Sequence, residues 1–189
     1  MSNFVALFDA CVFYPAPVRD LLMQLALTDL FRAKWSASIH DEWMAALARD
    51  RPDIPAERLE RTRAMMDNSV RDCLVTGFEY LIPVLELPDP DDRHVLAAAI
   101  HGRASVIVTY NLSDFPTETL SRFDIEPQHP DVFASCLMEL SPAKVVAAAR
   151  TVRERLRNPP IPAQQYLDNL EKQALVETVS MLRAYEAVI

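Results

Sequence analysis

Glycine is almost absent from this chain, which has only two glycines among 189 residues. Gly77 and Gly102 cannot form a GxGxxG loop or a P-loop, so the sequence excludes the common glycine-rich nucleotide-binding motifs. Proline, by contrast, is abundant, with 14 residues. This balance is typical of a helix-rich chain with proline-marked joints, and it excludes collagen and flexible linker arrays.

Cysteine is also scarce, and the three cysteines, Cys11, Cys73 and Cys136, are widely separated. No CxxC pair exists, so we expect neither a zinc knuckle nor a disulfide framework. The same pattern indicates a reducing compartment. The N-terminal apolar stretch lacks a basic segment and is interrupted by Asp9, which argues against a signal peptide or a membrane span. We therefore expect a cytoplasmic protein with no membrane partner.

Positive charge is the third shortage, because 19 Lys and Arg residues face 27 Asp and Glu residues, for a net charge of -8. A protein that grips duplex nucleic acid by positive charge alone is therefore disfavoured. Any contact with phosphate must come from local arginines or from bound cations. The four histidines include no HExxH motif, and no serine-triad or Cys–His signature is present.

Short apolar runs alternate with helical patterns up to about residue 130. We expect strands at 4–8, 34–36, 80–87, 105–110 and 124–128, and helices at 18–31, from Ser38 as a cap, from Pro55 through Arg71, and from Asp91 to a stop at Gly102. This alternation predicts an α/β fold, a parallel β-sheet of about five short strands flanked by helices.

Only helical patterns follow His129, at 131–140, 141–157 and 163–185. The sequence therefore predicts two domains. The α/β domain covers residues 1–130, and an all-helical C-terminal extension covers residues 131–189.

Carboxylates follow the strands of the expected sheet. Asp9 ends the first strand, Asp92 follows the 80–87 segment at a helix start, and Asp114 lies in the loop after 105–110. Loops beyond the carboxyl ends of parallel strands converge at one edge of the sheet, where ligands bind. Glu42, one turn into its helix, can reach the same edge. We expect these four acids to meet in one pocket.

Four carboxylates in one pocket raise one another's pKa unless a cation compensates their charge. Mg²⁺ and Mn²⁺ prefer oxygen ligands, and a bound cation can acidify a water, neutralise a phosphodiester and stabilise a leaving oxygen. Each acid except Asp9 has a structural alternative: Asp92 as a helix cap, Asp114 as a turn former, Glu42 as first-turn helix charge. Asp9 directly abuts a buried strand, where a carboxylate has no such role.

Four segments, in order, resemble the PIN-domain family. "FDACVFYPAPVRDLL" resembles its opening segment with Asp9, "SIHDEW" the second motif with Glu42, "DPDDRHVLAAA" the third with Asp92 and a supplementary Asp89, and "VTYNLSDFP" the fourth with Thr109, Asn111 and Asp114. The pattern is similar, more narrowly, to VapC-type toxins of bacterial toxin–antitoxin pairs with a helical C-terminal extension.

The resemblance implies a parallel sheet flanked by helices and a Mg²⁺- or Mn²⁺-dependent endoribonuclease. Asp9, Glu42, Asp92 and Asp114 would bind metal or orient the attacking water. The candidates for supporting or substrate contacts are Asp89, Arg93, Thr109 and Asn111. The implied partners are an RNA substrate, a small antitoxin and a second copy in a homodimer. One departure is Cys11, where the family often has a small polar residue, and this puts a supporting hydrogen bond in question.

Three alternatives stay open at this point. An aspartate-nucleophile phosphatase needs a second acid two residues after the first, where this chain has Cys11. A catalytically inactive PIN-like module would bind RNA or a partner without cutting, although such modules usually lose metal ligands. Arg93 and His94 could touch substrate phosphate, but solvated helix surface is the favoured interpretation of both.

Overall fold

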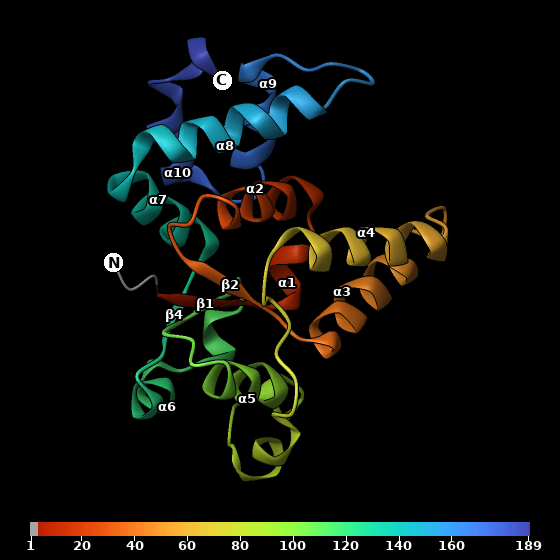
Figure 1. Ribbon diagram of the computed structural model, residues 1–189, viewed down its shortest axis with the longest axis vertical. Coiled ribbons are helices and arrows are strands. Elements are labelled where there is room, and N and C mark those ends of the chain that lie inside the picture. Colours follow the sequence, from red (N-terminus) through yellow and green to blue (C-terminus); the bar gives the residue numbers. More distant parts are fainter. Residues whose placement is uncertain (1–3) are drawn as a thin grey trace. The chain divides into compact units, whose positions relative to one another are not determined.

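The computed structural model describes residues 4–189, which form two compact units. The first unit contains the residues up to Tyr14 and Phe31–His129, and the second contains Pro15–Leu30 and Pro130–Ile189. A sheet with its helices makes up the first unit, and helices alone make up the second (Figure 1). The domain boundary at residue 130 stays a prediction, because Pro15–Leu30, on its N-terminal side, groups with the C-terminal helices.

Four parallel strands form the sheet of the first unit, in the order β2-β1-β3-β4. The strands are β1 (Val5–Phe8), β2 (Arg32–Lys34), β3 (Val106–Val108) and β4 (Glu126–Gln128). The central β3 is buried along its whole length, as a run of branched residues in a parallel sheet requires. The predicted α/β fold, a parallel sheet flanked by helices, is confirmed, with four strands among the described residues where about five were expected.

The strand predicted at 80–87 is wrong. This stretch begins with a 3-10 helix, η1 (Glu79–Val84), which contains Pro83. Proline has no N–H to donate to a strand ladder, and Tyr80 and Val84 are exposed rather than buried in a sheet. Asp92 therefore follows no strand. A second 3-10 turn, η2 (Pro90–Asp92), brings it to the start of the next helix.

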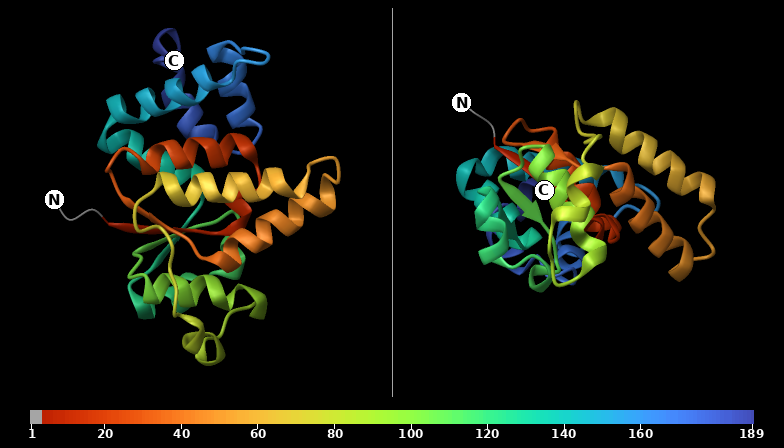
Figure 2. Two further views of the ribbon diagram at one scale, coloured as in Figure 1. Left: turned by 45° about the vertical axis from the view of Figure 1, so that its right-hand side comes forward. Right: turned by 90° about the horizontal axis from the view of Figure 1, so that it is seen from below.

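Helices connect the strands of this unit. They are α1 (Ala10–Phe13), α3 (Ala37–Asp50), α4 (Ala56–Ser69), α5 (Arg93–His101), η3 (Leu112–Asp114), α6 (Thr117–Leu120) and η4 (Ser121–Phe123). Helices α3 and α4 run side by side in both views of Figure 2. The predicted cap at Ser38 is wrong, since Ser36 is the N-cap of α3 and accepts a hydrogen bond from the Ile39 amide at 3.3 Å.

Helix α5 packs directly against β1 and β3. Its buried residues are small or branched (Val95, Leu96, Ala97, Ala98, Ala99), which lets the helix approach the sheet closely. Gly102 follows the helix as predicted, and its amide donates to the Ala98 carbonyl at 2.8 Å. The acidic segment before α5 is thus fixed at one end by a helix whose central residues, Val95–Ala99, are buried.

A buried polar network joins α3 to α4. The Trp43 indole donates to His40 Nδ1 at 2.9 Å, and His40 Nε2 bonds to Asp67 Oδ1 at 2.9 Å. The Trp35 indole donates to the same Asp67 oxygen at 2.8 Å. Because the indole N–H occupies Nδ1, the neutral His40 carries its proton on Nε2 and donates it to Asp67. The network fixes the helix that carries Glu42.

The second unit is all-helical, as the resemblance implied for the extension. It contains α2 (Ala16–Ala26), α7 (Pro130–Leu140), α8 (Pro142–Arg155), α9 (Ala163–Glu171), α10 (Val176–Arg183) and η5 (Glu186–Val188). The single helix predicted at 163–185 is wrong, because the chain turns at Ala174, with φ of 62°. Asp131 accepts from the amides of Glu177 at 2.9 Å and Thr178 at 2.8 Å, and so satisfies the free start of α10. Across residues 4–189, no helix combines the length and the apolar character needed to span a membrane.

Candidate active site

Asp9 is the centre of the candidate site. It directly follows β1, is only 3% exposed, and forms the N-cap of α1, so the expectation that a carboxylate at this position has no capping role is wrong. One carboxylate oxygen accepts from the Ala10 amide at 2.6 Å, and the other accepts from the Thr109 hydroxyl at 2.7 Å. Burial raises the pKa of Asp9, whereas these hydrogen bonds oppose that rise. Asp9 is therefore a buried carboxylate that the protein holds in one orientation.

The strand register explains why Thr109 reaches Asp9. Strands β1 and β3 are parallel neighbours, with Phe8 opposite Val108. The next residue of each strand is thus Asp9 and Thr109, and the Asp9 amide donates to the Val108 carbonyl at 3.1 Å. The Thr109 side chain is fully buried and has its hydroxyl fixed by a second bond, from the Asn111 amide at 3.0 Å.

Cys11 supplies the hydrogen bond that its identity put in question. Its thiol lies 3.0 Å from Asp9 Oδ2 and donates to that oxygen, while the Tyr110 amide donates to the sulfur at 3.2 Å. Burial raises the pKa of the Cys11 thiol far above its ordinary value, and the negative charge of Asp9 adds to the rise. The thiol thus stays protonated and is a weak donor, not a nucleophile.

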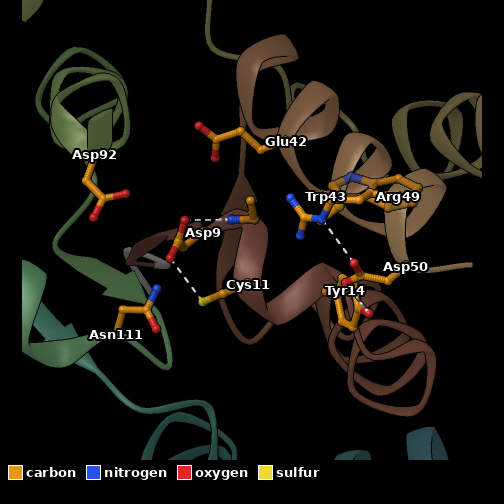
Figure 3. A pocket seen from close by; sticks show the side chains of 11 residues that line it. Asp9, Cys11, Tyr14, Glu42, Trp43, Arg49, Asp50, Asp92 and Asn111 are labelled. Atoms are coloured by element: carbon orange, nitrogen blue, oxygen red, sulfur yellow. Dashed lines mark hydrogen bonds and ion pairs between the residues drawn. The ribbon is translucent and has the colours of Figure 1, made fainter. Parts of the chain in front are cut away.

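A pocket of about 380 Å³ opens beside Asp9. Figure 3 shows Asp9, Glu42 and Asp92 turned toward the same space, with Asn111 below them. The three carboxylates come from the end of β1, from α3 and from the start of α5. Three of the four acids predicted from the sequence therefore line one pocket.

The pKa of Asp92 responds to the charges of the neighbouring acids. Its pKa is raised to about 7, first by burial and then by the negative charges of Asp9, Asp89, Asp114 and Glu42. Asp114 does not line the pocket, although its charge acts on Asp92; it ends η3, with its amide bonded to the Asn111 carbonyl at 3.0 Å. Asp89 is exposed and caps η2 by accepting from the Asp91 amide at 2.9 Å.

Glu42 is held by a partner that the sequence did not identify. Its carboxylate bonds to His94 Nε2 at 2.6 Å, and the His94 side chain is only 12% exposed. The interpretation of His94 as solvated helix surface is therefore wrong. The neighbouring Arg93 is half-buried, with an Nε that has no partner. No contact between Arg93 and the pocket was found in residues 4–189.

Two family models match this chain. Residues 5–113 match a family model described as "PIN domain", and residues 130–184 match one described as "VapC50 C-terminal domain". The first match covers more than half of the chain.

The chain belongs to the PIN-domain family.

A named relative of this PIN-domain protein is "Putative ribonuclease VapC50" from Mycobacterium tuberculosis. The two are 39% identical over 82 residues, which are 43% of this chain and 48% of that protein. The match thus spans about half the length of the relative. No solved structure matched the chain. The resemblance to PIN domains with a VapC-type C-terminal extension, inferred from four short motifs, is confirmed by the two family models.

The oxygen donors of this PIN domain suit a hard metal ion. Within residues 4–189, no group of three or more His, Cys, Asp or Glu side chains is arranged to hold a metal as it stands. Mg²⁺, however, keeps several waters and binds through one or two carboxylates, so three are not required. Asp9 and Asp92 are hard oxygen donors, and their negative charges repel one another. This chemistry fits a divalent cation.

Sequence reasoning missed four polar or aromatic residues that line the pocket. They are Tyr14, Trp43, Arg49 and Asp50. Helical spacing from Glu42 would have found one of them, since Ala46 and Arg49 follow at i+4 and i+7 on the same face of α3. Tyr14 and Asp50 had no such signal. Tyr14 is the C-cap residue of α1, a one-turn helix that no sequence pattern predicted, and this helix places it in the pocket lining.

Replacing Thr109 by Val is expected to lower RNA cleavage by about 10- to 100-fold, because it removes a hydroxyl that orients Asp9. Thr109→Ser keeps the hydroxyl and is the matched control. Initial cleavage rates of the two variants, with melting temperatures to confirm folding, provide the comparison. Equal rates for Val and Ser would show that the hydroxyl does not support Asp9 function.

Proposed function

We propose that this protein is an endoribonuclease that hydrolyses RNA phosphodiester bonds with the help of Mg²⁺ or Mn²⁺. The observation that carries the proposal is the convergence of Asp9, Glu42 and Asp92 on one pocket, where burial and then the charges of the neighbouring acids raise the pKa of Asp92 to about 7. Such a group repels RNA unless a cation is bound. The relative's printed name, a ribonuclease, supports the same activity class.

Asp9 and Asp92 would hold the cation, with Glu42 and Asp114 as further ligands or orienters of the attacking water. When bound, the cation supplies charge neutralisation for the phosphodiester and lowers the pKa of an attacking water. The chain's own residues orient the acids. Thr109 and Cys11 fix one oxygen of Asp9, and His94 fixes Glu42. Asn111 lies at the pocket surface, where its amide can contact substrate.

Hydrolysis places a water oxygen on phosphorus while the bond from phosphorus to the leaving oxygen breaks. The proton released by the water must leave the reacting centre, and the leaving oxygen must gain one. Bulk water reaches the open pocket and can take up the first proton and supply the second.

Removal of divalent cations tests this activity directly. RNA cleavage by the purified protein is expected to stop in excess EDTA and to return on addition of Mn²⁺ in excess of the chelator. The cleavage rate is measured with labelled RNA on a denaturing gel. Protein kept free of chelator gives the reference rate. A protein that binds RNA but cleaves it under no condition would support the inactive binding module instead.

The biological setting is part of the proposal. We infer that the protein acts in the cytoplasm as the toxin of a type II toxin–antitoxin pair, with a small antitoxin as partner, and that it forms a homodimer. The match of residues 130–184 to the VapC50 C-terminal domain supports the toxin assignment. Expression with and without the neighbouring gene, with growth and RNA ends as readouts, tests it. Unchanged growth without that gene would favour a maintenance nuclease.

A further inference from the structure

The pocket has a second side, which the carboxylates do not form. Tyr14, Arg49 and Asp50 line it, and we refer to these three residues as the Tyr14 wall. Figure 3 shows this wall facing Asp9 and Cys11 across the pocket, with Arg49 and Asp50 joined by a hydrogen bond. The site is therefore wider than a cation between two carboxylates requires.

Asp50 holds the other two residues of the Tyr14 wall in place. Its Oδ2 accepts from the Tyr14 hydroxyl at 3.0 Å, and its Oδ1 accepts from Arg49 Nε at 3.0 Å. The bond from Arg49, followed by that from Tyr14, holds the pKa of Asp50 below its ordinary value. Both oxygens of Asp50 thus have protein partners.

Stability does not explain the position of Arg49. Its side chain is 75% exposed, and its ion-pair partner is the adjacent residue. Exposed pairs of this kind contribute little to folding, because solvent screens them. The ion pair with Asp50 therefore leaves Arg49 available for another contact in the pocket.

Arg49 is the single cationic side chain among the described residues that line the pocket. Only its Nε is used by Asp50, so its two Nη groups donate to no acceptor in the described part of the chain. A guanidinium with free Nη donors matches the paired oxygens of a phosphate. The chain has a net charge of -8, so contact with phosphate must come from local arginines or bound cations, and Arg49 is such an arginine.

The spacing along α3 separates Arg49 from the acids. Glu42 and Arg49 lie seven residues apart on one face of the helix, which is about 10 Å along its axis. A phosphate beside Glu42 and a phosphate bound by Arg49 therefore belong to different positions along a strand. Tyr14, next to Arg49, offers an aromatic ring at the same end of the pocket.

We propose that the Tyr14 wall is a subsite for a nucleotide that flanks the cleaved bond in single-stranded RNA. Arg49 binds the phosphodiester of that nucleotide through its Nη groups, and Tyr14 stacks against its base. A base can stack on a side chain only where it is not paired, so the subsite selects single strands. The inference rests on the proposed function, since the same pocket would hold the cleaved bond.

The test measures binding in a protein that does not cut. Every variant carries Asp9→Asn, and the probe is a short fluorescein-labelled single-stranded oligoribonucleotide of mixed sequence in MgCl₂. Fluorescence anisotropy at several salt concentrations gives the affinity and its salt dependence. Arg49→Ala is compared with Arg51→Ala, which removes the same charge two residues away. Arg51 is also exposed, donates to Asp53 and does not line the pocket.

Arg49→Ala is expected to weaken binding about tenfold and to reduce the slope of log affinity against log salt by about 0.7, the value for one phosphate contact on a single strand. Arg51→Ala is expected to change neither quantity. With Asp9 restored, Arg49→Ala should raise KM and leave kcat within about twofold, because Arg49 does not contact the bond that breaks. Equal affinity and salt slope for the two arginine variants would overturn the proposal.

Tyr14 is tested by a matched pair of its own. Tyr14→Phe keeps the ring and loses the bond to Asp50, whereas Tyr14→Leu loses both. We expect Phe to bind within about threefold of the parent and Leu about tenfold more weakly, as a lost base–aromatic stack predicts. Equal affinities for Phe and Leu would overturn the stacking contact. Cleavage of the probe by the Asp9→Asn parent would instead contradict the proposed function, which keeps the two failures distinct.

Discussion

Replacing Asp9 by Asn is expected to lower the rate of RNA cleavage by on the order of 10²-fold or more, while the protein folds normally. Asn has the same shape and keeps an oxygen that can accept from the Ala10 amide, but it lacks the charge that would hold a cation. Burial raises the pKa of Asp9, which shows that the fold works against its ionised form. A neutral Asn should thus leave the melting temperature unchanged or raise it.

Asp91→Asn is the matched control for this substitution. Asp91 belongs to the acidic run that contains Asp92, but it is exposed and does not line the pocket. Its cleavage rate should stay close to that of the unaltered protein. Rates and thermal unfolding measured on all three proteins complete the comparison. An active Asp9→Asn protein would remove Asp9 from the mechanism, and an inactive, unfolded one would require the same measurement on Asp92→Asn.

The second large effect is expected on stability, at His40. This imidazole is fully buried, accepts from the Trp43 indole and bonds to Asp67. His40→Ala should lower the free energy of unfolding by about 3 kcal/mol, because it leaves a cavity and two polar groups without their partner. His101→Ala, at an exposed position on α5, should cost less than about 1 kcal/mol. Urea unfolding of both variants measures the difference.

The contribution of His40 depends on pH in a defined direction. Burial lowers the pKa of His40 from its ordinary value of 6.5, so the folded protein binds its proton less readily than the unfolded chain does. The contribution is therefore present above about pH 6.5 and is lost as the pH falls toward the folded-state pKa. His40→Gln removes this titration and keeps an amide that can bond to Asp67.

The stability gap between the unaltered protein and His40→Gln should narrow as the pH falls from 7.5 to 5, values chosen to bracket the ordinary histidine pKa of about 6.5. The same urea titrations, repeated across this range, provide the test. A gap that widens toward acid would mean that His40 is protonated in the folded state, in conflict with the indole bond to Nδ1.

Much of the fold was predictable because its signals are local. Val106–Val108 is a branched apolar run that only a buried strand explains, and the alanines of α5 indicated a helix that packs closely on the sheet. Asp9 was found in the same way, since it directly follows a buried strand. The register of β1 and β3 is enough to place Thr109 beside Asp9, because Phe8 lies opposite Val108.

The errors arise where local patterns compete with tertiary packing. The stretch 80–87 has strand composition, but Pro83 and the exposure of Tyr80 and Val84 fit a 3-10 turn. The contact between His94 and Glu42 joins residues 52 positions apart, and no periodicity encodes such a pair. Asp114 was predicted as a pocket acid from its loop; it does not line the pocket, although its charge acts on Asp92, and its role at the site stays a prediction.

The most direct measurement of the central claim is a crystal structure of the protein soaked in Mn²⁺, with data collected at the manganese absorption edge. An anomalous peak within coordination distance of the Asp9 and Asp92 carboxylates is expected, and its loss in Asp9→Asn crystals should follow. A well-ordered pocket with no peak at saturating Mn²⁺, or with manganese only at sites away from both carboxylates, would contradict the assignment of a metal-dependent nuclease centre.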